Sequence, residues 1–396
     1  MAAIFFAPLY VLVNLYIVRW IFLWTGSCST FFQSIGFRIV FSGIYLVFST
    51  SLLTGFLVKK PAPLRRVFKI MGNYFLGSFL YIFIVILTAD IGRYILQNSF
   101  HLSWLKTRST FVLCGGICTV LIVVISLYGF FHGSKIKTST YQISIDKKPP
   151  NISSLKIAFF ADCHFGYSTG LLQAKKICRK ISQEHPDLIC IGGDIFDNEY
   201  EAIRHPEKIQ KVLASMQSRY GTYACWGNHD LSEPILAGFT FPQNPDTLLD
   251  PRMKIFVEKS NIHILEDEVL LIDHSFYLAG RMDPDFARKT SRNRKTPAQL
   301  IKDLDRSKPV IILDHQPKEL QELAEAGADL DLCGHTHDGQ MFPGNIITRL
   351  FWKNSCGYLQ KGSMHNIVTS GTGIWGPAMR IGTNSEICII EISFRN

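Results

Sequence analysis

Two histidines stand one residue apart in the stretch DLCGHTHDGQMFPGN, with a glycine on each side. They are His335 and His337, and the glycines are Gly334 and Gly339. At the end of a strand or in an extended turn, residues i and i+2 point to the same side, so both imidazoles would face one point. The glycines would let the backbone approach whatever occupies that point. A metal ion explains this arrangement if other parts of the chain supply further ligands.

Further nitrogen and oxygen donors follow apolar runs elsewhere in the C-terminal two thirds of the chain. The runs LKIAFFADCHFG, PDLICIGGDIFDN, GTYACWGNHD and KPVIILDHQP each have the composition of a buried strand and the loop after it. Besides the two histidines, the polar residues at these strand ends are Asp162, His164, Asp194, Asn228, His229 and His315. In α/β sheets, ligands bind at the carboxyl ends of strands. Five such strand ends predict one shared metal site.

The elements that must position these residues alternate between strand and helix. Residues 170–183 have the apolar spacing of a helix, and a second helix is expected from about residue 201 to residue 218. Shorter strands near the C-terminus complete an α/β sandwich. Residues 135–155 are polar and contain two adjacent prolines, so we predict a connector there, followed by a second domain over residues 156–396.

The first third of the chain is apolar and carries the net charge. The 396 residues include 41 basic and 32 acidic ones. Residues 1–134 hold ten of the basic residues and one acidic residue, Asp90, which leaves 31 of each sign in residues 135–396. This neutrality argues against nucleic acid as the main partner of the C-terminal part.

Four apolar runs in residues 1–134 are long enough to cross a membrane, because a spanning helix needs about 20 residues. We expect spans near Ala2–Trp24, Gly36–Val58, Ile70–Ala89 and Thr110–Phe131, so residues 1–134 are predicted to be a transmembrane domain. A cleaved signal peptide is the alternative, but it has a charged start and a single short apolar core. It does not explain four runs.

Basic residues between the second and third runs predict the orientation. The loop KKPAPLRRVFK, Lys59–Lys69, carries five of them and is expected in the cytoplasm. Two further crossings return the chain to the same side, so residues 135–396 are expected to be cytoplasmic. The seven cysteines of that part are scattered without a C-x-x-C motif, which is typical of reduced thiols.

The motifs DCH, GDIFD, GNHD, LDHQP and GHTH resemble, in this order, the five motif blocks of the calcineurin-like metallophosphoesterases. The resemblance covers roughly residues 156–396. The stretches GHTHDGQMFP and GTGIWGPAMRIGTNSEI are similar to the membrane-anchored bacterial branch related to YkuE and YaeI. The resemblance implies a metallophosphoesterase sandwich, in which helices flank two central mixed β-sheets. It also implies a location in the inner or plasma membrane of a bacterium.

The same resemblance implies two divalent metal ions and their seven ligands. Asp162, His164 and His337 would bind one ion, Asn228, His315 and His335 would bind the other, and Asp194 would bridge them. Two ions about 3.5–4 Å apart clamp the attacking and leaving oxygens of an in-line displacement. Oxygen and imidazole ligands without thiolate suit Mn, Fe or Zn.

Four further residues have implied or candidate roles beside the metals. His229 would stabilise the charge of the phosphorane or protonate the leaving oxygen, and Asp197 would orient it, with a simple loop cap as the alternative for Asp197. Arg281 and Arg380 are candidates to hold a phosphate, with a structural salt bridge as the alternative for each.

These residues predict a membrane-anchored, dinuclear-metal-dependent hydrolase of a phosphodiester, phosphomonoester or pyrophosphate bond. A lipid-linked substrate is attractive because the spans keep the site within reach of the membrane. The family resemblance implies a UDP-diacylglucosamine-like molecule as one such substrate, because some relatives cleave UDP-diacylglucosamine. The alternative is a non-catalytic membrane receptor or scaffold that retains the fold, although all seven ligand positions and His229 are present. A nuclease is disfavoured by the neutral charge and the anchor.

Overall fold

The structure is a computed structural model and describes residues 2–236, 238–241 and 244–395. The chain folds into two compact units. The first unit comprises the chain up to Phe131 together with the segments Ile235–Thr240 and Gly376–Met379, and the second unit comprises the rest. The two units are described separately below.

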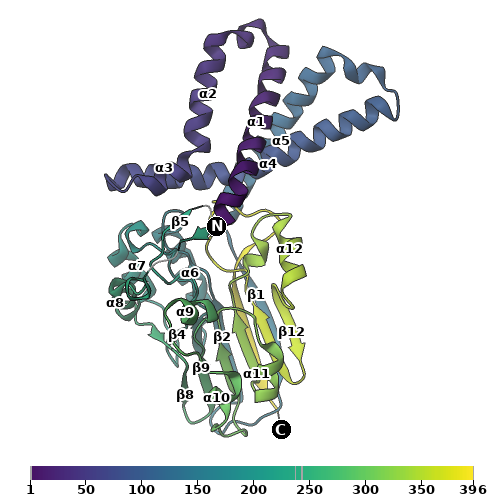
Figure 1. Cartoon of the computed structure of the whole chain (residues 1–396). Helices are drawn as coiled ribbons and strands as arrows, with labels where there is room; N and C mark the ends of the chain where they lie inside the picture. Colours follow the sequence, from purple (N-terminus) through teal and green to yellow (C-terminus); the bar gives the residue numbers. More distant parts are fainter. Residues whose placement is uncertain (1, 237, 242–243, 396) are drawn as a thin grey trace. The chain divides into compact units, whose positions relative to one another are not determined.

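The first unit consists mainly of apolar helices (Figure 1). They are α1 (Ala2–Cys28), α2 (Ile35–Ser49), α3 (Ser51–Leu57), α4 (Ala62–Asn98) and α5 (Arg108–Gly133), with 3-10 turns at Thr30–Gln33 and Ser103–Lys106. Among the described residues, α1, α4 and α5 are each long and apolar enough to cross a membrane. The pair α2 and α3 passes the same test only when taken together. The prediction of apolar N-terminal helices is confirmed, with three or four of spanning length.

The second predicted span is bent rather than straight. The helix breaks between α2 and α3, whose axes differ by 55°. Consecutive hydroxyl residues explain the break, because Ser49, Thr50 and Ser51 each donate a side-chain hydrogen bond to a backbone carbonyl three or four residues earlier. Such bonds compete with the regular helix ladder and bend helices. The expected span near Gly36–Val58 is therefore a broken helix.

Polar contacts join the helices of the first unit. Asp90 on α4 accepts hydrogen bonds from the Tyr16 hydroxyl, at 2.7 Å, and from the Trp20 indole, at 3.0 Å, both on α1. The short hairpin of β5 (Ile235–Leu236) and β6 (Phe239–Thr240) also belongs to this unit, and Lys69 on α4 donates to the Ile235 carbonyl at 3.0 Å. The charged groups of this apolar unit thus take part in specific hydrogen bonds.

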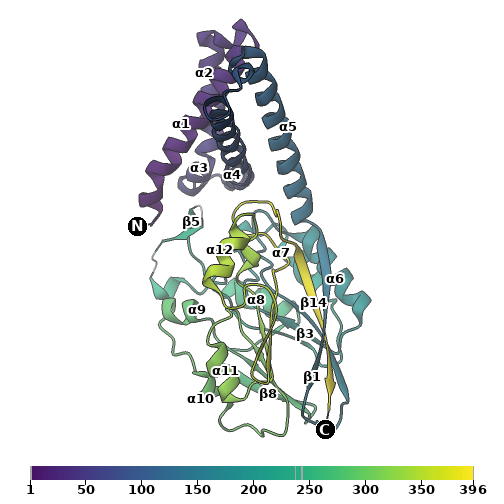
Figure 2. The same ribbon diagram turned by 90° about the vertical axis from the view of Figure 1, so that its right-hand side faces the viewer.

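The second unit contains two six-stranded mixed sheets (Figure 2). The first sheet has the order β1-β14-β2-β3-β4-β7, with strands Ile136–Ile145, Ser385–Phe394, Ser154–Phe160, Leu188–Ile191, Thr222–Ala224 and His263–Ile264. The second sheet has the order β12-β13-β11-β10-β9-β8, with strands Gly357–Lys361, Met364–Val368, Leu330–Cys333, Val310–Leu313, Phe276–Gly280 and Glu268–Ile272. The predicted two-sheet sandwich is confirmed.

Alternation along the strands builds three layers of core. On β2, Ile157 and Phe159 belong to the cluster that also holds residues of the second sheet, whereas Ala158 and Phe160 belong to the cluster shared with helices. The helices α6 (Leu171–Glu184), α7 (Pro206–Leu213) and α8 (Pro251–Lys259) cover the first sheet. The helices α10 (Pro297–Ile301) and α11 (Leu320–Ala326) cover the second, and α9 (Pro284–Lys289) and α12 (Gly344–Phe351) lie in the loops after β9 and β11.

Residues 136–145 form strand β1, where a connector over residues 135–155 was expected. β1 pairs with β14 in parallel over its whole length and buries Ile136, Ile143 and Ile145. Its remaining residues are mainly Lys, Thr, Ser and Gln, because one side of this edge strand is largely exposed to solvent. Because of these polar residues, the sequence pattern of β1 does not predict a strand. The boundaries predicted at residues 135 and 156 remain a proposal, and β1 argues for including it with the second domain.

We predict that a soluble fragment must begin before β1. A fragment of residues 134–396 is expected to unfold cooperatively, whereas a fragment of residues 156–396 exposes the edge of β14 and is expected to aggregate. Each buried isoleucine contributes roughly 1.5–3 kcal/mol, so the loss of three in β1 removes about 5 kcal/mol or more. Urea unfolding midpoints and the soluble fraction after ultracentrifugation measure the difference. Equal midpoints for the two fragments would show that β1 does not support the fold.

Candidate metal centre

The predicted ligands meet where five strands end. Asp162 and His164 follow β2, Asp194 follows β3, Asn228 follows β4, His315 follows β10, and His335 and His337 follow β11. The first three of these strands belong to one sheet and the last two to the other, so the site lies between the carboxyl ends of both sheets. This is where α/β sheets generally bind their ligands.

One group of donors consists of Asp162, His164 and His337. Their donor atoms lie within 4.8 Å of one another, and all three residues are buried. The Nε2 atoms of His164 and His337 are 3.0 Å apart, and His337 Nε2 is 3.8 Å from Asp162 Oδ1. Two imidazole nitrogens and a carboxylate that face one point are the donor chemistry of a transition-metal site.

A second group consists of Asp194, His315 and His335, with Asn228 beside them. His315 Nε2 lies 3.2 Å from Asp194 Oδ2 and 3.2 Å from His335 Nδ1. Asn228 Oδ1 is 2.8 Å from His335 Nδ1 and 3.1 Å from His315 Nε2. Asp194 Oδ2 also lies 3.7 Å from His164 Nε2, a member of the first group. Asp194 thus faces both groups, and the donor set fits two divalent cations that share one carboxylate.

Backbone groups hold the donors in orientation. His315 Nδ1 lies 2.7 Å from the Gly192 carbonyl, so Nδ1 carries a proton and Nε2 faces the site. The His229 amide donates to Asp194 Oδ1 at 2.7 Å, and the His335 amide donates to both oxygens of Asp162 at 3.1 Å. Each carboxylate therefore has a fixed hydrogen-bond donor on one side and imidazoles on the other.

The backbone at the site is strained. A positive φ, between 45° and 73°, occurs at Asp162, His164, Asp194, His335 and His337. Such left-handed conformations cost of order 1–3 kcal/mol each in residues other than glycine and cluster at functional sites. Close packing adds a further constraint, because a Cβ added to Gly227 would overlap Asp194 Oδ1. The strain is consistent with side chains being aimed at one point from short loops.

Burial and charge shift the ionisation of these groups. Burial raises the pKa of the Asp162 carboxyl to about 6. Burial alone would also raise the pKa of Asp194, but His315, His229 and His164 outweigh it and lower that pKa below its usual range. Burial lowers the pKa of the His229 imidazole to about 4. The Asp194 carboxylate is therefore ionised and His229 is neutral at neutral pH in this structure.

Asn198, rather than Asp197, contacts the imidazole of His229. Asn198 Oδ1 is in hydrogen-bond contact with His229 Nδ1, and the Asn198 amide NH2 donates to the Leu231 carbonyl at 3.1 Å. Asp197 Oδ1 instead lies 3.5 Å from Nδ1 of His164. The structure thus places Asn198 beside His229 and Asp197 beside His164, and the role expected of Asp197 stays a prediction. A sequence signal that could have identified Asn198 as a partner of His229 is its position directly after Asp197.

Arg281 pairs with carboxylates of the protein. Its side chain is completely buried and forms ion pairs with Asp314, at 2.6 Å, and Glu319, at 2.7 Å. These ion pairs agree with the salt-bridge alternative, and the phosphate contact of Arg281 stays a prediction.

Arg380 is also completely buried, and it contacts the metal-site loop. Its guanidinium donates to the carbonyls of Ser370, Gly373, Asn384 and His337 at 2.6 to 3.2 Å. These bonds join the loop that carries His337 to the C-terminal tail. Arg380 Nη2 also lies 3.3 Å from His337 Nδ1, so Arg380 contacts both the carbonyl and the ring of His337. The phosphate contact of Arg380 stays a prediction.

Two tryptophans that the sequence did not single out stand beside the site. The ring of Trp352 lies 5.2 Å from that of His335, and the ring of Trp375 lies 5.8 Å from that of His229. Lys318 Nζ lies 5.6 Å above the Trp352 ring. An apolar wall with a cation suits an organic phosphate, but no spacing motif identifies such residues.

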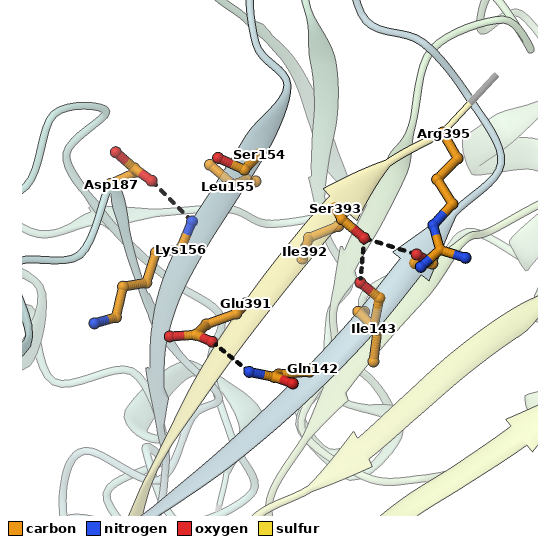
Figure 3. Close-up of a pocket in the computed structure, with 11 residues that line it drawn as sticks. Gln142, Ile143, Ser154, Leu155, Lys156, Asp187, Glu391, Ile392, Ser393 and Arg395 are labelled. Atoms are coloured by element: carbon orange, nitrogen blue, oxygen red, sulfur yellow. Dashed lines mark hydrogen bonds between the residues drawn. The ribbon is translucent and has the colours of Figure 1, made fainter.

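A hollow of about 630 Å³ lies elsewhere, over β1, β14 and β2 (Figure 3). Its lining includes the exposed residues Gln142 and Arg395 and the half-buried residues Lys156 and Glu391, several of which form hydrogen bonds. None of the predicted ligands lines it. The site is therefore defined by its donors rather than by this hollow.

Comparison with known proteins agrees with these motifs. The family model described as calcineurin-like phosphoesterase matches residues 155–339. A Helicobacter pylori (strain J99) relative described as an uncharacterized metallophosphoesterase is 32% identical over 280 residues, covering 68% of this chain and 67% of the relative. The Bacillus subtilis relative named YkuE is 27% identical over 274 residues, covering 66% and 87%.

Two further relatives bear on the membrane. A Danio rerio protein described as a transmembrane protein with metallophosphoesterase domain is 27% identical over 286 residues, covering 70% of this chain and 62% of the relative. A Chlamydia trachomatis protein described as the UDP-2,3-diacylglucosamine pyrophosphatase LpxG is 24% identical over 231 residues, covering 50% and 68%. The similarity thus extends to relatives with membrane or lipid-related descriptions.

The contacts predict different losses for Asn198→Ala and Asp197→Ala. Asn198→Ala releases His229 and is expected to lower turnover roughly 10–100-fold while metal content stays unchanged. Asp197→Ala frees His164 and is expected to weaken metal binding by a similar factor. Competition with a chelator measures metal affinity, turnover of an aryl phosphodiester measures rate, and thermal unfolding controls for stability. The reverse pattern would restore Asp197 as the partner of His229.

Proposed function

Because the chain belongs to the calcineurin-like metallophosphoesterases, we propose that it is a membrane-anchored hydrolase of a phosphodiester, phosphomonoester or pyrophosphate bond. The observation that carries this proposal is the pair of donor groups that meet at Asp194. The ions are divalent, with Mn, Fe and Zn as the candidates that suit oxygen and imidazole ligands.

Several residues of the chain have separate roles around the two metal ions. When bound, two divalent ions polarise a phosphoryl oxygen and supply a water nucleophile at neutral pH. Asp194 fixes the spacing of the two donor groups, because its carboxylate faces both. His229 has its Nδ1 held by Asn198, which leaves Nε2 to contact the phosphoryl group or the leaving oxygen. Trp352 and Trp375 restrict water at the rim of the site.

The competing proposal is a non-catalytic membrane receptor or scaffold. Such a protein needs neither a complete ligand set nor a held histidine beside it. In this chain all seven donors converge and His229 contacts Asn198. We therefore favour the hydrolase.

A lipid-linked substrate is the more specific form of the proposal. It is supported by the three or four apolar helices of spanning length and by the distant similarity to a protein described as acting on UDP-2,3-diacylglucosamine. An enzyme and a substrate confined to one surface meet at a raised effective concentration. We therefore propose an amphiphilic phosphoester or pyrophosphate.

Turnover by the full chain in detergent tests the proposal. The panel comprises an aryl phosphodiester, an aryl phosphomonoester and a lipid pyrophosphate, each with Mn, Mg and Zn. His229→Asn is expected to keep both metals and lose rate by roughly 10²–10⁴, the range of general acid–base groups. Asp194→Asn, the matched control, is expected to lose metal and activity together. Metal content that falls equally in both variants would make His229 a ligand, and no turnover of any substrate would favour the receptor.

We also propose that the second unit faces the cytoplasm. The basic segment Lys59–Lys69, predicted as a loop, runs into the first turns of α4 (Ala62–Asn98). The start of α4 is separated from the second unit by two helices of spanning length, α4 and α5, so the two lie on the same side whether or not α2 and α3 cross.

Thiol labelling of intact cells tests this orientation. In a background without the native cysteines that are not buried, Cys28, Cys114 and Cys356, a cysteine at position 59 and another at position 172 are expected to resist a membrane-impermeant reagent until the cells are lysed. A cysteine at position 31, in the loop after α1, is the control for the opposite side if α2 and α3 together cross. Labelling of position 172 in intact cells would place the catalytic unit outside.

A further inference from the structure

Helix α12 presents an apolar face to solvent. Ile346, Ile347, Leu350 and Phe351 have exposed fractions of 52, 50, 79 and 80%. Their spacing places them on one side of the helix. A run of large apolar side chains exposed on one face typically marks a protein or membrane contact.

The ends of α12 are attached to the candidate metal centre. Its N-terminus follows the 3-10 turn His337–Gly339, which contains a predicted ligand. Its C-terminus is followed by Trp352, whose ring lies 5.2 Å from that of His335. The Thr336 hydroxyl also donates to the Ser355 carbonyl, which ties the two flanks of the helix together. Whatever covers α12 is therefore held close to the metals.

The stretch of chain that contains α12 carries charge of one sign, although Asp338, just before it, lies close enough to Arg349 to interact with it. From Met341 to Lys361 the chain has no acidic residue, but it has the basic residues Arg349, Lys353 and Lys361. Arg349 and Lys353 are exposed. Apolar residues beside exposed cations are the composition of helices that lie in the interface of an anionic bilayer.

The chain also enters the second unit next to this loop. His132 and Gly133, the last residues of α5, belong to that unit. His132 Nε2 lies 3.0 Å from the Thr383 carbonyl, and the Ser385 hydroxyl donates to the Gly133 carbonyl at 2.9 Å. The same tail carries Arg380, which donates to the His337 carbonyl at 3.2 Å. Within the second unit, the residues that follow the spanning part of α5 are thus bonded to the tail that contacts the metal-site loop.

From these observations we propose that α12 inserts its apolar face into the headgroup region of an anionic bilayer and holds the metal centre at the membrane surface. Arg349 and Lys353 contact lipid phosphates, while Ile346, Ile347, Leu350 and Phe351 contact the upper acyl chains. This inference rests on the proposed function only where it concerns the substrate, which would then reach the site directly from the membrane. A second copy of the chain is the competing occupant.

Spin-label accessibility in proteoliposomes tests the insertion with the full chain. The label is placed at Leu350→Cys, and Leu172→Cys on α6 is the matched control, because Leu172 is a leucine with a similar exposed fraction of 76%. Cys28, Cys114 and Cys356, the native thiols that are not buried, are replaced by serine in both variants. The vesicles contain phosphatidylcholine with phosphatidylglycerol, and the two relaxing agents are oxygen and a water-soluble nickel chelate.

The Leu350 label is expected to collide with oxygen several-fold more often, and with the nickel chelate several-fold less often, than the Leu172 label. Arg349→Gln together with Lys353→Gln is expected to reduce that difference in the anionic vesicles. Equal access of the chelate to both labels would overturn the inference. Shielding of Leu350 from both agents would also overturn it, because a protein partner excludes oxygen as well.

This measurement requires no turnover. If α12 inserts but the chain hydrolyses no substrate, the insertion of α12 is supported and the proposed hydrolase activity is overturned. If the chain hydrolyses a substrate but the Leu350 label stays in water, the hydrolase activity is supported and the insertion of α12 is overturned. Each proposal can therefore be contradicted without the other.

Discussion

The burial of the Asp194 carboxylate among histidines is the interaction on which the second unit depends. Asp194 is 1% exposed, and its two oxygens face the imidazoles of His315 and His164 and the amide of His229. An ionised carboxylate taken out of water costs several kcal/mol unless its partners compensate. Here the partners come from both sheets, since His315 follows β10 and Asp194 follows β3. The sandwich and the site therefore require each other.

This requirement accounts for local features that a stable core alone would avoid. Left-handed backbone at five of the predicted ligands and the lack of room for a Cβ at Gly227 are unfavourable for folding. They are supported by strands whose side chains are buried on both faces, such as β2, β3, β10 and β11. Rigid strands with short loops place polar side chains to a fraction of an ångström, which a metal centre needs.

Two buried arginines near the site bind partners that residue type alone does not specify. Arg281 and Arg380 are both fully buried, yet one pairs with carboxylates and the other with backbone carbonyls. Each contacts a loop next to the candidate metal centre. The exposed features near the site are of another kind, namely the tryptophans at its rim and the apolar face of α12. Substrate selection is therefore expected to depend on these apolar groups as much as on charge.

Much of this protein follows from the sequence, because strand ends, apolar runs and charge are local patterns. Runs such as LKIAFFADCHFG predict a buried strand and its terminal ligands, and the uncharged runs of the first 134 residues predict apolar helices of spanning length. The family motifs add the two-sheet fold. The individual ligand and catalytic roles still await measurement, although the structure brings the seven donors together.

Only the tertiary structure decided the features that depend on distant neighbours. β1 is a strand because β14 pairs with it, although its own composition is that of a connector. Asn198 contacts His229 because of how one loop turns, and Arg281 pairs internally because Asp314 and Glu319 lie beside it. Side-chain partners are set by geometry across the chain, and residue type and spacing along the chain do not specify that geometry.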